Sequence, residues 1–347
     1  MSINIIFGLL LIASGAFTSG SFAVPFGKIK GWNWETYWMV YSLGAYIILP
    51  WLACFIFSPG FVQIIGSAQH STLITVFLLG AVYGIGNLAF GLSLRYLGLS
   101  LGYALALGLM LAIGTLIPPL IDGRLKLMMQ GSGGTLLFIG IAVACLGIAL
   151  SAWSGILKDK QISDAKKQES IGEFNLVKGI MAAVLVGITG SAMSLAFEQG
   201  LPLAEIAGKQ GVDPLYVTMP VLLIMLSGTF VTTIIWCGYL GYRNHSLVNY
   251  VKSESSRRLT FNYLFGLLAG LLWFSNLILF GMGKSKMGPF TFTSWGILMA
   301  LTIVCATIWG LIRREWKGAS LKVYVLMIFS LLIIIAASFL IGISGSE

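Results

Sequence analysis

The sequence predicts an all-α polytopic membrane protein, with ten transmembrane helices arranged as two inverted five-helix repeats. Hydrophobic residues make up 57% of the 347 positions, charged residues make up only 10%, and the mean hydropathy is +0.93. These values are far from those of a soluble globular domain. Ten apolar runs are each long enough to span a bilayer, and a charged interval separates the first five from the last five. The runs are continuous rather than alternating, which favours helices over a β-barrel.

The expected helices follow one another with short connections. Each contains roughly 20 or more mostly apolar residues, the length that crosses the hydrocarbon core. They cover about residues 3–24, 35–57, 72–94, 97–120, 133–156, 176–199, 213–241, 261–283, 288–312 and 320–343. No basic segment precedes the first run, so we expect a first helix and not a cleaved signal peptide.

The basic residues indicate how the chain is oriented. The formal net charge is +9, yet 16 of the 21 Lys and Arg residues lie in the odd-numbered loops between these helices. Positive charge concentrates in cytoplasmic loops, which places both termini outside. The basic balance therefore predicts a lipid bilayer as partner, and no nucleic acid.

The polar interval at 157–175, LKDKQISDAKKQESIGEFN, is the expected cytoplasmic linker between two domains. The first five-helix repeat then covers 1–156 and the second covers 176–347. Because five is an odd number, the two halves enter the membrane from opposite sides, which is the inverted-repeat plan of many secondary transporters.

A faint internal repeat supports this duplication. Shifting the segment 80–102 by 190 positions aligns several glycines, places Tyr83 over Trp273 and leaves Asn276 one position from the place of Asn87. Weaker matches at shifts of 172 and 178 follow in the same order, although each shift is chosen to fit. The repeat predicts a polar site in each half.

Asn87 and Asn276 are the leading candidates for ligand binding. An unsatisfied amide is costly in hydrocarbon and usually faces protein or a water-filled cavity. Each asparagine shares a helix face with an aromatic residue, Tyr83 or Trp273. A sugar needs this combination, because its C–H faces stack on rings while its hydroxyls need donors and acceptors. The alternative is that the amides only bind one helix to another.

Other intramembrane polar and aromatic residues extend the candidate site. They are Ser19, Tyr103, Ser191, Thr293 and Trp295. Many of the hydroxyls are expected to bond carbonyls of their own helices, the default for Ser and Thr in membranes. No intramembrane pair of Arg or Lys is available to bind an anion, which favours a neutral polyhydroxylated solute.

Uphill transport without ATP needs a coupling ion, and a buried carboxylate can carry a proton near neutral pH. Glu35 is expected to open the second helix, Asp213 to open the seventh and Glu198 to close the sixth. Glu35 and Asp213 precede Glu198 as candidates. Acids at helix N-termini also have a simpler explanation, because the helix dipole favours them there.

The motifs of several other classes are absent from the sequence. It has no phosphate-binding loop, no H-E-x-x-H, no C-x-x-C and no G-x-S-x-G. His70 and His245 lie in loops on opposite sides, and the four cysteines lack metal or redox spacing. We expect no metal, no cofactor besides the proton and no obligate protein partner. The interpretation is a secondary active transporter, with a facilitator or exporter of another neutral polar metabolite as the alternative, ahead of a membrane enzyme or a sensor.

Four separated segments resemble a known family. They are WNWETYW at 32–38, GIGN at 84–87, GLSLRYLGLSLG at 91–102 and GVDPLYV at 211–217. Together they resemble the L-rhamnose-proton symporters of enteric bacteria, from the first helix to the last. That family belongs to the drug/metabolite transporter superfamily, whose members share ten helices in two inverted halves.

The resemblance implies proton-coupled uptake of L-rhamnose, and of L-lyxose or L-mannose, across the bacterial inner membrane by alternating access. It also implies a central cavity lined by helices 1, 3, 4, 6, 8 and 9, which carry the candidate residues. One difference concerns Phe290–Thr293, where an acidic, tyrosine-flanked stretch is expected before the Ser-Trp of helix 9. If the family uses a carboxylate there, this chain must differ in its substrate or its proton site.

Overall fold

A computed structural model describes residues 3–121, 132–161, 173–287 and 294–344. Throughout these ranges the regular secondary structure is helical, without a strand. Eight helices in the described part are long and apolar enough to cross a membrane, by length and composition. The chain is a multi-pass, all-helical membrane protein, as the sequence predicts.

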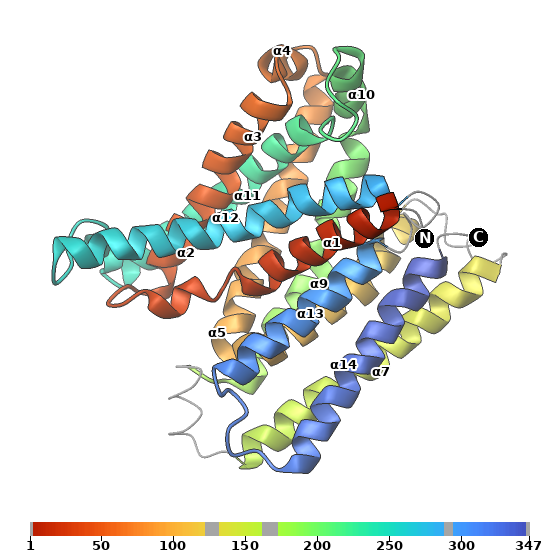
Figure 1. The fold of residues 1–347 in the computed structure, drawn as a ribbon. Helices are drawn as coiled ribbons and strands as arrows, with labels where there is room; N and C mark the ends of the chain where they lie inside the picture. The colour runs from red at the N-terminus through yellow and green to blue at the C-terminus, as the bar shows by residue number, and fades with distance from the viewer. Residues whose placement is uncertain (1–2, 122–131, 162–172, 288–293, 345–347) are drawn as a thin grey trace. The chain divides into compact units, whose positions relative to one another are not determined.

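Figure 1 shows the helices along the chain. They are α1 (Ile3–Ser21), the 3₁₀ turn η1 (Pro25–Lys28), α2 (Trp34–Ser42), the π turn η2 (Leu43–Ile48), α3 (Leu49–Phe57), α4 (Phe61–Gly66), α5 (His70–Ile121), α7 (Ser132–Gln161), α9 (Leu176–Gln199), α10 (Leu201–Lys209), α11 (Met219–Arg243), the 3₁₀ turn η3 (Ser246–Tyr250), α12 (Ser256–Lys286), α13 (Ser294–Ile312) and α14 (Leu321–Ser344). The short helices α4 and α10 lie in segments that the sequence analysis assigned to loops.

The chain forms two compact units. Unit 1 comprises Met1–Ser21, Gly86–Ser191 and Ile278–Glu347, and unit 2 comprises Phe22–Ile85 and Ala192–Leu277. Each unit combines segments from both predicted halves of the sequence, and α5, α9 and α12 each contribute residues to both units. The predicted repeats at 1–156 and 176–347 stay predictions.

The helix α5 contains a backbone break at Gly98. Its φ of 81° and ψ of −179° lie outside the helical region, in a conformation that only glycine adopts readily. The sequence analysis expected separate helices at 72–94 and 97–120, so the break falls at the start of the second. The 52 residues of α5 would extend about 78 Å if straight.

In unit 2, α11 packs on α2, η2 and α3. The first part of α5 approaches α11 so closely that a Cβ at Gly80 would lie 1.9 Å from the carbonyl oxygen of Met225, and Thr229 donates a hydrogen bond to the Gly80 carbonyl over 2.9 Å. The π turn η2 ends two residues before Pro50, which has no N–H to donate to the preceding turn, so the backbone widens there.

In unit 1, α7 lies beside α14, and α1 lies beside α13, as Figure 1 shows. Glycines permit both approaches. A Cβ at Gly147 would lie 2.7 Å from the side chain of Ile334, and a Cβ at Gly20 would lie 2.7 Å from that of Cys305. Small residues at such contacts are typical of helix packing in membranes.

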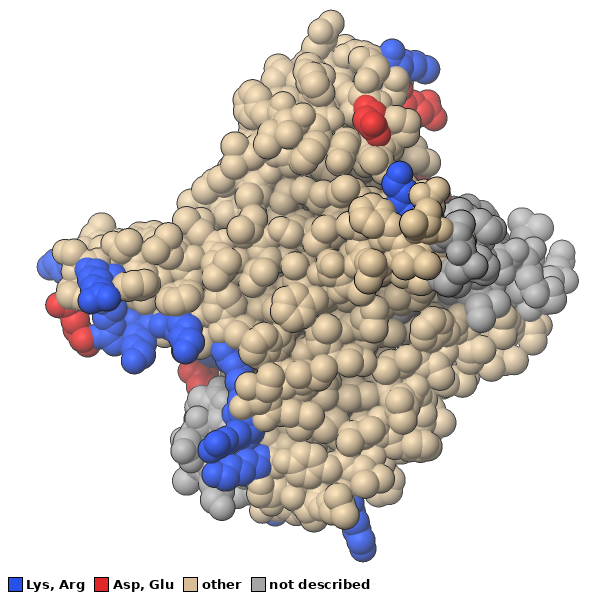
Figure 2. Space-filling model, in the orientation of Figure 1, with Lys and Arg blue, Asp and Glu red and all other residues tan. Residues whose placement is uncertain are grey.

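Large apolar side chains are exposed on helices of both units, among them Phe55, Ile235 and Phe329. The face in Figure 2 is mostly uncharged, with Lys and Arg gathered in a few places. Apolar surface of this extent indicates contact with lipid, because soluble proteins rarely expose it.

Candidate functional site

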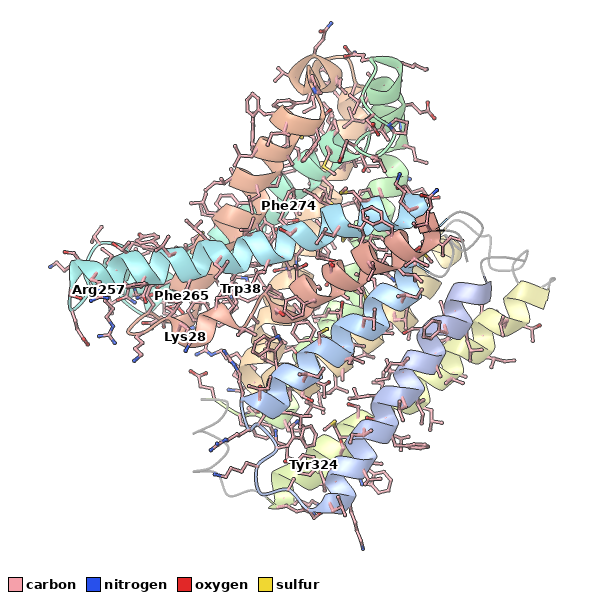
Figure 3. All side chains as sticks on the ribbon, viewed as in Figure 1. Lys28, Trp38, Arg257, Phe265, Phe274 and Tyr324 are labelled. Carbon is pink, nitrogen blue, oxygen red and sulfur yellow. The ribbon has the colours of Figure 1, made fainter. Side chains whose placement is uncertain are left out.

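In unit 2, Trp273 of α12 lies against an aromatic cluster from the segment that begins at Phe22. Its ring centroid is 5.2 Å from that of Tyr46 and 6.4 Å from that of Tyr41, with the rings nearly perpendicular. The two tyrosine hydroxyl oxygens are 3.1 Å apart. Trp38, labelled in Figure 3, lies 4.9 Å from Tyr41, and Phe22 stacks on Tyr41 at 5.4 Å. Trp273 therefore belongs to a buried wall of rings that the sequence did not reveal.

Asn276 lies one helical turn after Trp273. Its amide nitrogen donates to the Trp273 carbonyl over 3.4 Å, a long bond. Its side-chain oxygen is buried and has no hydrogen-bond partner among the described residues. A buried acceptor without a donor costs about 1–3 kcal/mol, so this oxygen is suited to receive a hydroxyl of a ligand.

Asn87 and Tyr83 lie on α5, four residues apart, and the two residues belong to units 1 and 2 respectively. Asn87 is buried and Tyr83 is half-buried. The neighbouring Gly86 brings α5 against α9, since a Cβ there would lie 2.3 Å from Oγ1 of Thr189. Ser191 on α9 is buried, and its hydroxyl donates to the Ile188 carbonyl over 3.0 Å, the back-bonding expected of membrane serines.

The structure brings Tyr103 and Ser19 together in unit 1. The Tyr103 hydroxyl donates to the Ser19 carbonyl oxygen over 2.7 Å, which joins α5 to α1. The Tyr103 ring also meets the edge of Phe90 at 5.1 Å. Tyr103 is 1% exposed, with its hydroxyl bonded to Ser19 and its ring packed on Phe90.

Trp295 is the second residue of α13 and packs on Phe280 of α12, with ring centroids 5.6 Å apart. It is 38% exposed, the most open of the predicted aromatic site residues. Thr293 lies outside the described residues, as does the Phe290–Thr293 segment that differs from the family pattern.

Among the predicted acids, Glu35 has the most enclosed environment. It lies in the first turn of α2, as predicted, and is 3% exposed. Its Oε1 accepts hydrogen bonds from the Ser246 hydroxyl at 2.6 Å and from the Asn244 amide at 3.0 Å. These partners come from the turn between α11 and η3, where His245 adopts a left-handed φ of 53°. The sequence analysis missed both partners, because no spacing along the chain relates them to Glu35.

The prediction that Asp213 opens the seventh helix is wrong. The helix α11 begins at Met219, and Asp213 lies in an exposed turn where its carboxylate accepts the Leu215 N–H over 2.8 Å. Pro214 disfavours helical geometry at the residue before it, so the chain turns there first. Glu198 closes α9 as predicted and is half-buried.

Two buried charged residues were missed entirely. Glu315, in the connection after α13, is 3% exposed, and Lys158, near the end of α7, is 1% exposed. The sequence analysis assigned Lys158 to the cytoplasmic linker at 157–175, but α7 continues to Gln161 and Lys158 lies buried in this helix, within unit 1. In the part of the chain that the structure describes, no group of three or more His, Cys, Asp or Glu could hold a metal ion.

Residues 1–346 match the family described as L-rhamnose-proton symport protein. The chain belongs to this family. It is 34% identical over 344 residues to the L-rhamnose-proton symporter of Yersinia pestis strain Pestoides F, covering 99% of this chain and 98% of that protein. The protein of the same name from Yersinia pseudotuberculosis strain YPIII gives the same values. No solved structure matches. The family is one of transporters and not of enzymes.

Proposed function

We propose that this chain takes up L-rhamnose together with protons. The observation that carries the proposal is membership in the L-rhamnose-proton symport family over residues 1–346. Relatives matched over nearly their whole length are named L-rhamnose-proton symporters. L-lyxose and L-mannose are proposed as further substrates.

The sugar contacts are proposed from the chemistry of the buried polar atoms. The open acceptor on Asn276 suits a hydroxyl, and the adjacent Trp273 ring suits a C–H face or the methyl group of a deoxy sugar. In unit 1, Tyr103 offers an aromatic ring and a hydroxyl. The hydroxyl donates to the Ser19 carbonyl oxygen, and a ligand oxygen would compete with this carbonyl for it. The proposed substrate-binding residues are Ser19, Tyr83, Asn87, Tyr103, Ser191, Trp273, Asn276, Thr293 and Trp295.

Glu35 is the proposed proton carrier, ahead of Glu198 and Asp213. Its carboxylate is buried, and the side chains of Ser246 and Asn244 that donate hydrogen bonds to it are neutral. A serine hydroxyl can donate to the ionised acid or accept from the protonated one, so Glu35 can gain and lose a proton with little rearrangement. The exposed turn around Asp213 offers no such environment.

The proposed setting is the bacterial inner membrane, with ten crossings in two inverted repeats and both termini outside. The length of α5 supports counting it as two crossings, because about 30 Å spans one hydrocarbon core. Counting α13 as a further crossing gives ten in place of eight. Alternating access around the sugar would then move the two repeats against each other.

Uptake by proteoliposomes tests the proposal. Purified protein should accumulate radiolabelled L-rhamnose when an acid-outside pH gradient is imposed, and should lose this accumulation when an ionophore dissipates the gradient. Unlabelled L-rhamnose should compete better than nucleosides or amino acids. Uptake that equilibrates without accumulating, whatever the gradient, would instead identify a facilitator.

The Asn87→Ala variant separates a ligand role from helix packing. A ligand role predicts that uptake is abolished while the thermal midpoint in detergent stays near that of the wild type. A variant that loses its fold would show that Asn87 binds helices together, as membrane amides also do.

A further inference from the structure

The carboxylate of Glu315 holds the start of a helix segment in unit 1. One oxygen accepts the Leu99 N–H over 2.8 Å and the other accepts the Ser100 N–H over 3.2 Å. These are the first residues after the break at Gly98, where helix N–H groups lack partners within the helix. Glu315 thus supplies, from the connection after α13, the cap that the broken helix needs.

Two glycines make room for this contact. A Cβ at Gly98 would lie 2.7 Å from a Glu315 carboxylate oxygen, and a Cβ at Gly310 would lie 2.8 Å from the same oxygen. Gly98 has a positive φ, and Arg314, directly before the acid, has a φ of 60°. The backbone therefore turns through a positive φ on both sides of the carboxylate, a conformation that Gly98 adopts readily.

A buried cation shares the site. The Lys158 ammonium lies 4.7 Å from the ring centre of Trp316 and 5.3 Å from that of Phe174. Trp316 is held in turn by Tyr324, labelled in Figure 3, whose hydroxyl donates to the Trp316 carbonyl over 2.7 Å. Lys158 is seated on aromatic faces, an arrangement that stabilises a desolvated cation.

Two cations act on the Glu315 carboxylate. α7 contributes Lys158, and Arg313 follows the end of α13; both charges favour the ionised acid. On α5, Arg95 precedes the break at Gly98 and pairs with Glu173 at 2.5 Å. Burial outweighs the cations and the two backbone donors, and raises the pKa of the Glu315 carboxyl above its ordinary value of 4.5.

Protonation must disturb this contact. The donors to Glu315 are backbone N–H groups, which cannot become acceptors, so a protonated carboxyl keeps at most a weakened hold on them. The affected helix segment carries Tyr103 one turn later, and the Tyr103 hydroxyl binds the Ser19 carbonyl. The loss of one cap is therefore transmitted to a proposed sugar-binding residue within a single helical turn.

We propose that Glu315 is a proton-operated positioning residue, which as a carboxylate fixes the helix segment carrying Tyr103 and which releases that segment when it takes up a proton. The proposal rests on the proposed function only for its effect on sugar binding. The titration of Glu315 itself requires no sugar.

Infrared difference spectra of the full chain in lipid, recorded against pH, test the titration. The C=O stretch of a protonated carboxyl should titrate above pH 4.5 in the wild type and should be missing from Glu315→Gln. Lys158→Met keeps Glu315, and the apolar Trp316 and Phe174 faces accommodate the methionine. Because Lys158 favours the ionised acid, the band should move to higher pH in this variant. Lys317→Met, which removes an exposed charge from the same connection, should leave the band unchanged.

Rhamnose exchange at equal pH and equal sugar on both sides tests the positioning. In the wild type, KM for L-rhamnose should change with pH over the range of the infrared titration, by roughly tenfold, the size of one charge-assisted hydrogen bond. In Glu315→Gln, the part of the KM change that coincides with the infrared titration of Glu315 should disappear, while the pH dependence due to proton coupling at Glu35 and the maximal exchange rate remain. In Lys158→Met, the pH range over which KM changes should rise together with the pH at which the Glu315 infrared band titrates.

Failure of the inference about Glu315 and failure of the proposed function give different results in these experiments. An infrared spectrum in which Glu315→Gln removes no titrating band, or in which Lys158→Met leaves the band in place, overturns the inference whatever the sugar data show. A band that behaves as expected with an unchanged KM profile overturns the positioning role. A wild type that exchanges no rhamnose contradicts the proposed function and leaves the infrared result standing.

Discussion

Among the residues that the structure describes, two acids are buried, Glu35 in unit 2 and Glu315 in unit 1; each is 3% exposed, but their partners differ. Glu35 accepts from a serine hydroxyl and an asparagine amide. Glu315 accepts from two backbone N–H groups beside a buried lysine. Burial alone therefore does not define the role of an intramembrane or near-membrane acid.

The donors decide what protonation does at each acid. When Glu35 is protonated, its O–H can donate to the Ser246 hydroxyl after that hydroxyl rotates, or to the amide oxygen of Asn244. Hydrogen bonds to Glu35 can therefore form in both protonation states. Backbone N–H groups have no such freedom, so protonation of Glu315 must change the backbone contact. The arrangement at Glu35 suits a residue that carries a proton. The arrangement at Glu315 suits a residue whose protonation moves the helix segment bonded to it.

The largest expected effect comes from Glu35→Gln. Glutamine keeps an oxygen for Ser246 but cannot release a proton, so proton-driven rhamnose accumulation should fall to the background of protein-free vesicles. Rhamnose exchange without a gradient should persist. Glu254→Gln, which removes an exposed acid from the same unit, should accumulate sugar as the wild type does. Normal accumulation by Glu35→Gln would show that Glu35 does not carry the coupled proton.

Asn276→Ala should follow in size. Loss of the open acceptor leaves a sugar hydroxyl without a partner, and KM for exchange should rise by roughly ten- to a hundredfold. The pH dependence of KM should be retained, because Glu315 is intact. Ser285→Ala, exposed on the same helix, is the control. An unchanged KM would show that the Asn276 oxygen does not face the sugar.

Gly98→Ala probes the backbone around Glu315. The added Cβ meets the carboxylate at 2.7 Å and the φ of 81° is strained for alanine, so we expect a loss of about 1–3 kcal/mol. Thermal denaturation in detergent measures it. Gly238→Ala, in a helix with open space at its Cβ, should not lower the midpoint, and an equal loss in both variants would contradict the account.

The smallest effect is the pH dependence of stability. Because the fold raises the pKa of Glu315, the folded state favours the protonated form. The contribution of Glu315 is fully present below pH 4.5 and is lost as the pH rises through the raised value. Glu315→Gln should therefore gain stability relative to the wild type as the pH rises across that interval. A difference that is constant with pH would contradict the raised pKa.

The sequence predicted the parts of this structure that follow from local chemistry. Apolar runs predicted the helices, and Glu35 was placed correctly in a first helical turn. Asp213 was misplaced because Pro214 delays the helix to Met219, a local effect that the apolar run obscured. Ser246, Glu315 and Lys158 were not identified because their roles depend on contacts between distant segments, such as the 216 positions between Glu315 and Leu99.

The repeat of an aromatic residue near an amide predicted part of the candidate site, and that part stays a prediction. It identified Trp273 and Asn276, both of which are buried. It gave no sign of Tyr41 and Tyr46, which complete the ring cluster, because their approach to Trp273 depends on how α12 packs on α2. Close glycine contacts, such as Gly270 against the Tyr41 carbonyl, determine that packing and have no periodic signature.

The most direct test of the account is the pH of a lightly buffered medium outside proteoliposomes when L-rhamnose is added without an imposed gradient. Symport predicts that the medium becomes more alkaline with the wild type, because protons enter with the sugar. The same addition should give no pH change with Glu35→Gln, although labelled rhamnose still exchanges. Rhamnose entry into wild-type vesicles without alkalinisation would contradict proton coupling, and alkalinisation that persists in Glu35→Gln would contradict the role given to Glu35.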